Sequence, residues 1–171
     1  MRVSAKVDYA LRAAAQLAAV SADGQPLKAE TIARAQDIPP SFLLGILREL
    51  TRARILKSHR GSDGGYSLAR PAADITLAEV MRVIDGPLVN LRDSHIRELG
   101  YDGASEALED VWMAVRSSVR AVLETVSLDD LARGSLPKTV RSLAAEYVRS
   151  ELARPGVKLS SVAAEGRPAQ S

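Results

Sequence analysis

The sequence predicts a mainly α-helical fold with one small β-hairpin, and three patterns support this prediction. Apolar residues recur at helical spacing in several segments of the 171-residue chain. Two short segments of alternating polarity flank a glycine-rich turn at 61–65, as the strands of a hairpin do. Hydrophobic residues make up 46% of the chain, which suffices for the core of about one domain with extensions.

Two helices are predicted before residue 37. The first covers about Ser4–Val20, and its apolar face consists of Val3, Val7, Ala10, Leu11, Ala14, Leu17 and Ala18. The second is short and covers Leu27–Gln36, with Ile32 and Ala33 turned inward. Asp37 follows at a turn where we expect a positive φ, because aspartate is among the few residues besides glycine that tolerate one.

A third helix is predicted over Pro40–Arg54. Pro39 and Pro40 prevent the preceding helix from continuing, and proline is well suited to the first turn of a new helix. Its apolar face is formed by Ile46, Leu47, Leu50 and Ile55. A second face lies outside this one and contains Ser41, Phe42, Leu44, Gly45 and Arg48. This second face is therefore free to contact another molecule.

The predicted hairpin follows the third helix directly. Its strands alternate around the glycine-rich turn through Leu56, Ser58, Tyr66 and Leu68. Arg60 stands at the edge of the tip, and a capping box at Thr76–Glu79 then opens a helix that Gly86 closes, with Val80, Val83 and Ile84 buried. Two helices joined by a turn and followed by a hairpin form a winged helix-turn-helix, so residues 1–86 are predicted to be a DNA-binding domain.

Residues 87–134 are predicted to contain a loop and a long dimerisation helix. Asn90–Gly103 has no clear periodicity and is either a regulatory loop or a simple connection. Beyond it, apolar residues alternate spacings of four and three in a heptad seam of Leu108, Trp112, Val115, Val119, Val122 and Val126. A seam this short also fits a helix packed within its own domain. We favour a homodimer interface, because a small winged domain has little core to cover the seam.

The rest of the chain is predicted to form short helices and a tail. Ser127 restarts a short helix that stops at Gly134. A C-terminal amphipathic helix is predicted within 135–153, through Leu136, Val140, Leu143 and Tyr147. Residues 154–171 lack periodicity and are predicted to be a disordered tail.

The composition argues against several classes of function. Cysteine is absent, which removes disulfides, zinc–thiolate sites and a cysteine-ligated iron–sulfur cluster. The two histidines lack metal-binding spacing, so neither a metal site nor a cofactor is predicted. There is no apolar run of eighteen residues and no signal sequence, and we expect a cytoplasmic protein with no membrane partner. Without a supported catalytic set, no enzyme is predicted.

Charge is distributed unevenly along the chain. Residues 1–70 hold 11 Lys+Arg against 6 Asp+Glu, and the remainder holds 12 against 15, so the two parts carry +5 and −3. A basic part joined to a mildly acidic one suits nucleic-acid binding, although ordinary scatter of surface charge explains the numbers equally well. The same two interpretations, phosphate contacts or a solvated face, apply to Lys28, Arg48, Arg52 and Lys57.

Several segments in a particular order carry a family resemblance. They are MRVSAKVDYALRA, IPPSFLLGILRELTRARIL, SHRGSDGGYSLAR, TLAEVMRVIDGP and the Trp112 helix that ends in VSLDDL. Over about residues 1–133 the chain resembles the Rrf-two superfamily of bacterial winged-helix transcription regulators, and the R-G-x-x-G-G-Y element at Arg60–Tyr66 is the most specific part. The resemblance implies a homodimer that places a recognition helix in the major groove and a wing in the minor groove of double-stranded DNA.

The resemblance also assigns roles to individual residues. Arg60 matches the wing arginine that enters the minor groove, and Ser41 and Phe42 match a Ser-Tyr pair at the start of the recognition helix. Leu44 and Gly45 stand where some members carry polar residues that contact bases. Leu44 is suited instead to contact with a thymine methyl group, and Gly45 to a close approach of the helix to DNA. The full predicted DNA-binding set is Lys28, Ser41, Phe42, Leu44, Gly45, Arg48, Lys57, His59, Arg60 and Gly61.

The sensor is where the sequence departs from the family. Several members bind an iron–sulfur cluster through three cysteines in the loop corresponding to about Asp93–Glu106, and this chain has none. Asp8 matches a carboxylate ligand of one branch and Glu109 stands near a histidine ligand of another. The candidate effector residues are therefore Asp8, His95, Glu109 and Trp112, each with a plain alternative as a surface carboxylate, a loop histidine or a seam anchor. One branch of the family has no cluster and responds through a protein partner. The resemblance to that branch implies that this chain responds to a small-molecule or protein effector.

The function predicted from the sequence is a homodimeric, sequence-specific DNA-binding transcription regulator that represses by occupying a palindromic operator. The alternative is a protein-interaction regulatory module, in which the winged domain is a scaffold and the seam or last helix binds a metabolic enzyme or another regulator.

Overall fold

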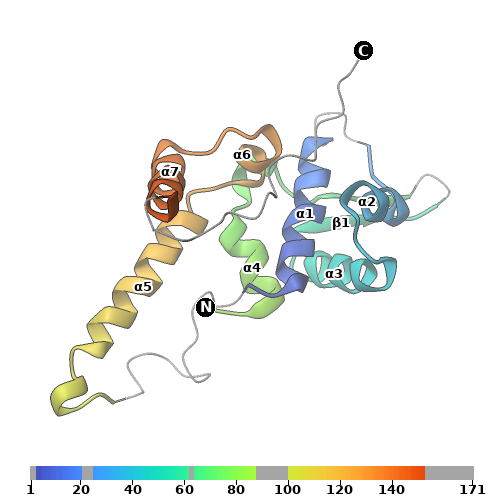
Figure 1. Ribbon diagram of the computed structural model, residues 1–171. Helices are drawn as coiled ribbons and strands as arrows, with labels where there is room; N and C mark the ends of the chain where they lie inside the picture. Colours follow the sequence, from blue (N-terminus) through green and yellow to red (C-terminus); the bar gives the residue numbers. More distant parts are fainter. Residues whose placement is uncertain (1–2, 21–24, 62–63, 88–99, 153–171) are drawn as a thin grey trace. The chain divides into compact units, whose positions relative to one another are not determined.

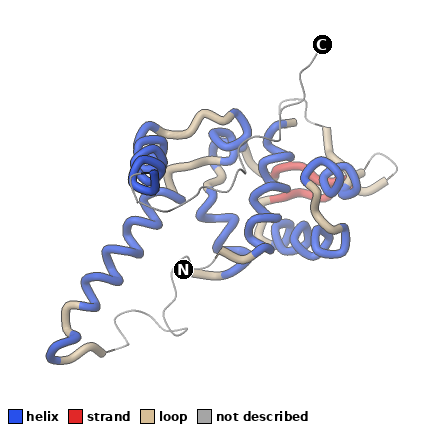
Figure 2. Tube along the Cα trace, in the orientation of Figure 1, coloured by secondary structure: helices blue, strands red, loops and turns tan. Residues whose placement is uncertain are grey.

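The computed structural model describes residues 3–20, 25–61, 64–87 and 100–152 (Figure 1). The predicted tail at 154–171 and most of the predicted loop at 90–103, including His95, lie outside these residues. The chain divides into two units, residues 1–137 and 138–171, which are described separately. In the described part of the chain, helices and one two-stranded antiparallel hairpin make up the regular structure, which confirms the predicted fold class (Figure 2).

Helix α1 (Ala5–Ala19) lies at the centre of the first unit, where it packs against α2, α3, α4 and α6. The Ser4 hydroxyl caps it by accepting the N–H of Val7 at 3.1 Å. Its buried face contains four alanines, whose small side chains let the neighbouring helices approach closely. This face consists of Val7, Ala10, Ala13, Ala14, Leu17 and Ala18, so the helix is amphipathic as predicted. Val3, which the predicted face includes, precedes the helix and is 55% exposed, and Leu11 is partly buried.

Helix α2 (Ala29–Gln36) begins two residues later than predicted. Leu27 forms an antiparallel bridge with Tyr66, in which each backbone N–H donates to the carbonyl oxygen of the other residue, at 2.9 and 2.8 Å. This pairing holds Leu27 in an extended conformation that a helix does not allow. Asp37 ends α2 in the left-handed region at φ 50°, as predicted, and the inward residue Ile32 is fully buried.

Helix α3 (Pro40–Arg52) has the two faces that its sequence predicts. The buried face contains Leu43, Ile46, Leu47 and Leu50. Ser41, Phe42, Leu44 and Arg48 are exposed. The helix ends two residues before the predicted Arg54, because Arg54 adopts a left-handed φ of 59° that a right-handed helix excludes.

The wing pairs β1 (Leu56–His59) with β2 (Gly65–Leu68) in the register Leu56 to Leu68. Two adjacent glycines make this geometry feasible. A Cβ atom on Gly65 would overlap the Leu27 carbonyl oxygen, and one on Gly64 would overlap the His59 carbonyl oxygen. Glycine is therefore required at both positions by close approach of backbone to backbone.

Helix α4 (Leu77–Asp85) follows a short 3₁₀ helix, η2 (Ala72–Asp74). Thr76 and Glu79 form the predicted capping box, and Gly86 ends the helix at φ 80°, as predicted. Val80 is fully buried, whereas Val83 and Ile84, which we expected to be buried, are only partly so. Both lie in the last turn of this nine-residue helix and pack against the core while partly exposed.

The described chain resumes at residue 100. A 3₁₀ turn, η4 (Gly103–Ser105), precedes α5 (Leu108–Leu123), and α6 (Leu128–Arg133) packs against α1 and η2. The Leu77 N–H donates to the Val126 carbonyl at 3.0 Å, and the Leu128 N–H donates to the Ile75 carbonyl at 2.8 Å. Residues 126–133 therefore complete the core of the winged domain, although they follow residue 86, the predicted end of that domain.

Helix α7 (Lys138–Leu152) belongs to the second unit and coincides closely with the predicted C-terminal helix. Its apolar residues Leu143, Tyr147 and Val148 are exposed. None of the helices in the described residues combines the length and the apolar character needed to cross a bilayer.

Candidate nucleic-acid interface

The exposed face of α3 presents apolar and small residues at the start of the helix. Phe42 is 59% exposed and Leu44 is 42% exposed, so this face presents two large apolar side chains to solvent. Gly45 lies on the same side, and a Cβ atom built on it would meet nothing within 4 Å. Packing within the chain therefore does not require glycine at this position. The face is open for contact with a partner, as the sequence predicts.

Contacts from α1 hold the start of α3 in place. The Tyr9 and Phe42 rings meet edge to face, with centroids 6.4 Å apart and planes 67° apart. The Arg12 guanidinium lies 5.7 Å from the Tyr9 ring centroid and also donates to the Gln36 carbonyl oxygen at the end of α2. Phe42 is thus exposed on one side and fixed on the other, which orients it.

Arg12 also provides a partner for Asp8. The two side chains form an ion pair one helical turn apart, at 3.3 Å, and the Asp8 side chain is 57% exposed. The structure thus places this candidate effector residue in the setting of an ordinary surface carboxylate.

The wing places one cation at its tip and uses a histidine for its own geometry. Arg60 and Lys57 are exposed. His59, by contrast, hydrogen bonds through Nε2 to the Ser67 hydroxyl across the hairpin, at 2.8 Å. Gly61 follows Arg60 with φ 104°, a conformation that favours glycine and turns the chain at the tip. Arg60 is therefore the wing side chain best placed to reach another molecule.

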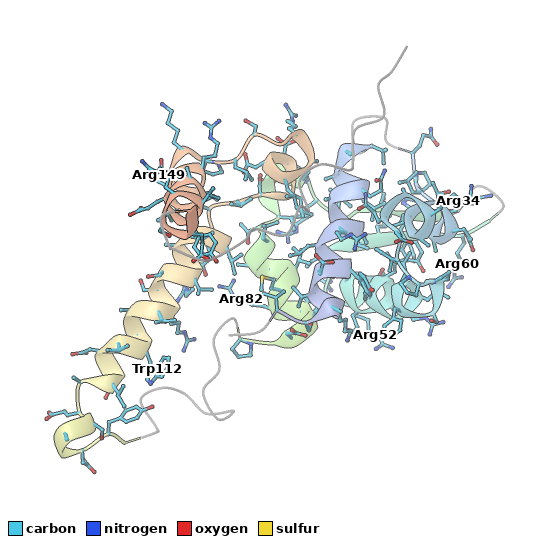
Figure 3. The ribbon with its side chains drawn as sticks, viewed as in Figure 1. Arg34, Arg52, Arg60, Arg82, Trp112 and Arg149 are labelled. Atoms are coloured by element: carbon cyan, nitrogen blue, oxygen red, sulfur yellow. The ribbon has the colours of Figure 1, made fainter. Side chains whose placement is uncertain are left out.

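Basic side chains on α2, α3 and the wing have no ion-pair partner within the described residues. These are Lys28, Arg34, Arg48, Arg52, Arg54, Lys57 and Arg60. Figure 3 labels Arg34, Arg52 and Arg60, one from each of these elements. The other cations among the described residues up to 87 are paired, as in Lys6 with Glu49 at 2.8 Å and Arg70 with Glu79 at 2.9 Å. In this part of the described chain, the unpaired cations thus lie on or beside α2, α3 and the wing, where Glu30 and Asp37 are also exposed and form no ion pair with a described residue. We call these cations the unpaired basic set.

Helix α5 exposes the predicted seam, with one correction. In the described structure no residue of α5 is buried, and Leu108 and Val115 are 40% and 39% exposed. Val111 and Met113, which the predicted seam omits, are exposed at 49% and 37%. Trp112, Val119 and Val122 are partly exposed.

Val126 does not belong to this seam. The helix ends at Leu123, and Val126 is only 2% exposed in the core of the winged domain. The heptad spacing extends to Val126 in the sequence, but the backbone leaves the helix before reaching it. A residue buried within one chain is not available to a second chain, so the prediction for Val126 is wrong.

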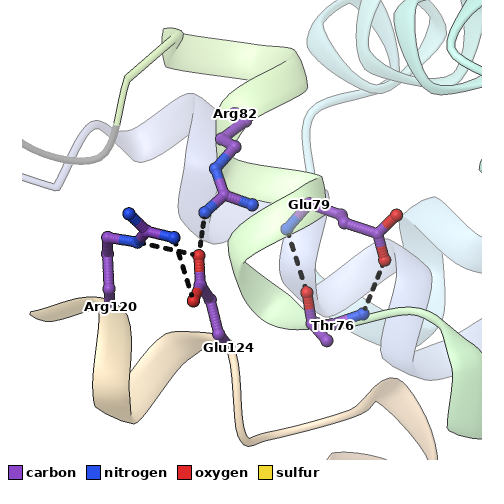
Figure 4. A network of polar contacts seen from close by, with 5 residues as sticks. All are labelled: Thr76, Glu79, Arg82, Arg120 and Glu124. Carbon is purple, nitrogen blue, oxygen red and sulfur yellow. Dashed lines mark hydrogen bonds and ion pairs between the residues drawn. The ribbon is translucent and has the colours of Figure 1, made fainter.

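A polar network joins α4 to the end of α5 (Figure 4). Glu124 accepts hydrogen bonds from Arg82 on α4 and from Arg120 on α5, the latter at 3.0 Å. The hydrogen bonds from Arg120 and Arg82 lower the pKa of Glu124 below its ordinary value. The i,i+4 spacing of Arg120 and Glu124 is visible in the sequence, but the Arg82 contact spans 42 residues and has no sequence signal.

The donor set does not fit a metal cluster of the usual kind. An iron–sulfur cluster requires thiolate ligands, and the sequence has no cysteine. Across residues 3–20, 25–61, 64–87 and 100–152, no three histidine, aspartate or glutamate side chains gather as a metal site. Glu109 is partly exposed in the first turn of α5, and His95 lies outside the described residues.

The fold and the exposed surface define a winged helix-turn-helix protein: two helices joined by a left-handed turn at Asp37, followed by a hairpin with a cationic tip. The chain belongs to the Rrf2 family, because the family model described as "Iron-dependent Transcriptional regulator" matches residues 3–134. It is a DNA-binding transcription regulator and not an enzyme.

Similar proteins are found in bacteria. A Mycobacterium tuberculosis chain named as an HTH-type transcriptional regulator, Rv1287, is 49% identical over 156 residues, which are 91% of this chain and 96% of that one. The HTH-type transcriptional regulator CymR of Bacillus subtilis is 30% identical over 132 residues, 77% of this chain and 90% of that one. The 156-residue match exceeds the family region, so the similarity to the mycobacterial chain includes part of the C-terminal region after residue 134.

Solved structures agree with the fold. The structure of CymR, titled as the global cysteine regulator of B. subtilis, gives a TM-score of 0.63 at 27% identity and covers 78% of this chain and 97% of that one. The structure of T. potens IscR gives 0.64 at 29% identity, covering 79% and 88%. These comparisons confirm the predicted family and fold class.

Proposed function

We propose that this regulator is a homodimer that binds a specific palindromic operator and represses by occupying it. The observation that carries the proposal is the unpaired basic set, whose residues lie on or beside α2, α3 and the wing and include Arg60 at the wing tip. Cations that lack an internal partner remain available to neutralise DNA phosphates, and the release of counterions then supplies salt-dependent affinity. A cytoplasmic location follows from this role.

Sequence recognition is proposed to divide between helix and wing. The Ser41, Phe42 and Leu44 side chains would contact base edges in the major groove, with Leu44 suited to a thymine methyl. Arg60 would enter the adjacent minor groove, where A·T-rich DNA concentrates negative potential. The Lys28, Arg48 and Lys57 side chains would contact phosphates and set the register.

The proposed dimer uses α5. Its exposed apolar residues have no cover in the first unit, and a sixteen-residue helix offers a continuous strip for a second copy related by a twofold axis. A twofold protein requires a twofold site, so the operator is expected to be palindromic. We further propose that the signal comes from a small-molecule or protein effector and that the protein works without a resident iron–sulfur cluster, since it has no thiolates.

The test is selection of genomic fragments by the purified protein at near-physiological salt, followed by footprinting. A symmetric protected site and a steep salt dependence are expected. Arg60→Ala should cost about 1–3 kcal/mol of operator binding. The matched control is Arg133→Ala, which removes an exposed arginine from α6. Weak binding that is independent of sequence, or equal effects of both substitutions, would contradict the proposal.

The alternative of a protein-interaction module has its own observation, the exposed Leu143, Tyr147 and Val148 on α7. Under this alternative, Arg60→Ala would leave partner binding intact and Tyr147→Ala would weaken it.

A further inference from the structure

A hollow of about 490 Å³ lies where the end of α4 meets α5. It is lined by Arg82, Gly86, Pro87, Arg116 and Arg120. A space of this size admits a small metabolite. Of the five described residues that line it, three are arginines, and none of the three belongs to the predicted DNA-binding set.

Among the described residues at the hollow, positive charge exceeds negative charge. Glu124 is the carboxylate that compensates the arginines, and it is shared between Arg82 and Arg120 (Figure 4). Arg116, one turn before Arg120, has no ion-pair partner among the described residues. The carbonyl groups at the end of α4 add about half a negative charge. Asp85 is exposed and does not line the hollow. The described side chains at the hollow therefore carry a net positive charge.

We propose that this hollow binds a small dianion, either a phosphoryl group or a dicarboxylate. Guanidinium groups recognise such oxyanions through paired N–H donors in a planar fork. Arg116 would supply a guanidinium group that has no ion-pair partner among the described residues. Arg120 would exchange its contact with Glu124 for one with the ligand. The bound dianion thus competes with Glu124 for the arginines.

This competition gives the site a regulatory consequence, which rests on the proposed function. Glu124 links Arg82 of the winged domain to α5, the proposed dimerisation helix. A dianion that takes over these arginines replaces that link, and so changes how α5 is held against α4. The two DNA-binding domains of a dimer would then be set at a different angle, because each is joined to its α5 at this point.

Binding is tested with the full chain by calorimetric titration of inorganic phosphate, and separately of succinate, at constant ionic strength in chloride. Saturable binding is expected, and the ligand with the lower half-saturation identifies the preferred chemistry. Arg116→Gln should raise the half-saturation about 10–100-fold through loss of a charged hydrogen bond. Glu124→Gln removes the internal competitor and should lower it. Arg149→Gln, which removes an exposed arginine on α7, should leave it unchanged.

Several results would overturn the proposal. One is the absence of saturable binding by either anion, and another is equal titration of Arg116→Gln and Arg149→Gln, as a general salt effect predicts. A third is a reduction by about one, in Arg116→Gln, of the slope of log operator affinity against log salt, which would make Arg116 a DNA phosphate contact.

Measurements of operator affinity distinguish a failure of this anion site from a failure of the proposed function. Saturating dianion should change the operator affinity of the unsubstituted protein and leave that of Arg116→Gln unchanged. Saturable anion binding by a chain that binds no operator would refute the proposed function and leave the site standing. Operator binding without saturable anion binding would refute the site alone.

Discussion

Gly45→Ala separates the role of α3 in folding from its role in recognition, because the two effects have opposite signs. A Cβ atom at residue 45 meets nothing within 4 Å, so alanine fits without strain. Replacing glycine inside a helix by alanine stabilises it by about 0.5–1 kcal/mol. For a chain of this size, the melting temperature should rise by about 1–4 °C.

Operator binding should respond in the other direction. Gly45 shares the exposed face with Phe42 and Arg48, which lie one turn to either side. If the helix backbone approaches the bases there, an added methyl group must displace a packed contact, at a cost of about 1–3 kcal/mol. The dissociation constant should then rise by about 5–150-fold.

Thermal unfolding and a fluorescence-anisotropy titration with operator DNA measure the two effects. Ser150→Ala, an exposed helical substitution on α7, serves as the control and should leave operator affinity unchanged. Unchanged affinity in Gly45→Ala would refute the close approach of α3 to DNA. A lower melting temperature would refute the inference that residue 45 faces open space.

Three further outcomes are expected. Val115→Asp should convert the proposed dimer to monomers in analytical ultracentrifugation, because it places a charge on the exposed strip of α5; an unchanged sedimentation coefficient would count against that interface. Val126→Ala should lower stability by about 2 kcal/mol and the melting temperature by about 4–8 °C, because it removes two buried methyl groups and leaves a cavity. An effect as small as that of Val111→Ala would show that Val126 is not in the core. Ser127→Ala should cost about 1 kcal/mol through loss of the cap of α6. Hydrogen bonds from Ser127 lower the pKa of Asp130 below its ordinary 3.8, so this stabilisation is present above that value and is lost as the pH falls through the lowered pKa. The difference between Ser127→Ala and the unsubstituted protein should therefore shrink below about pH 4 in thermal scans, and a difference independent of pH would contradict the assigned role of Asp130.

Local patterns in the sequence predict much of the winged domain. The positive φ of Asp37, the capping box at Thr76 and the exposed face of α3 all depend on residues within a few positions of one another. Periodicity identifies which side of a helix is apolar, and residue type identifies its ends. These are the predictions that the structure confirms.

The errors come from contacts between distant segments. Leu27 has helical neighbours in sequence but pairs with Tyr66, thirty-nine positions away. Val126 continues a heptad pattern but turns into the core, because its backbone bonds to Leu77. The Arg82–Glu124 pair is likewise invisible in a single sequence. Partner choice over such distances depends on the tertiary fold, which local patterns do not encode.

The glycine pair in the wing limits how this regulator can change its DNA preference. Any side chain at Gly64 or Gly65 meets backbone atoms, of His59 and Leu27 respectively, and backbone does not move aside as a flexible side chain does. Mutations at either position therefore damage the hairpin before they alter what it contacts. New specificity is more accessible by exchange of the exposed Lys57 and Arg60. The backbone of the wing therefore tolerates little change at its glycine pair, whereas the side chains that would contact DNA can be replaced.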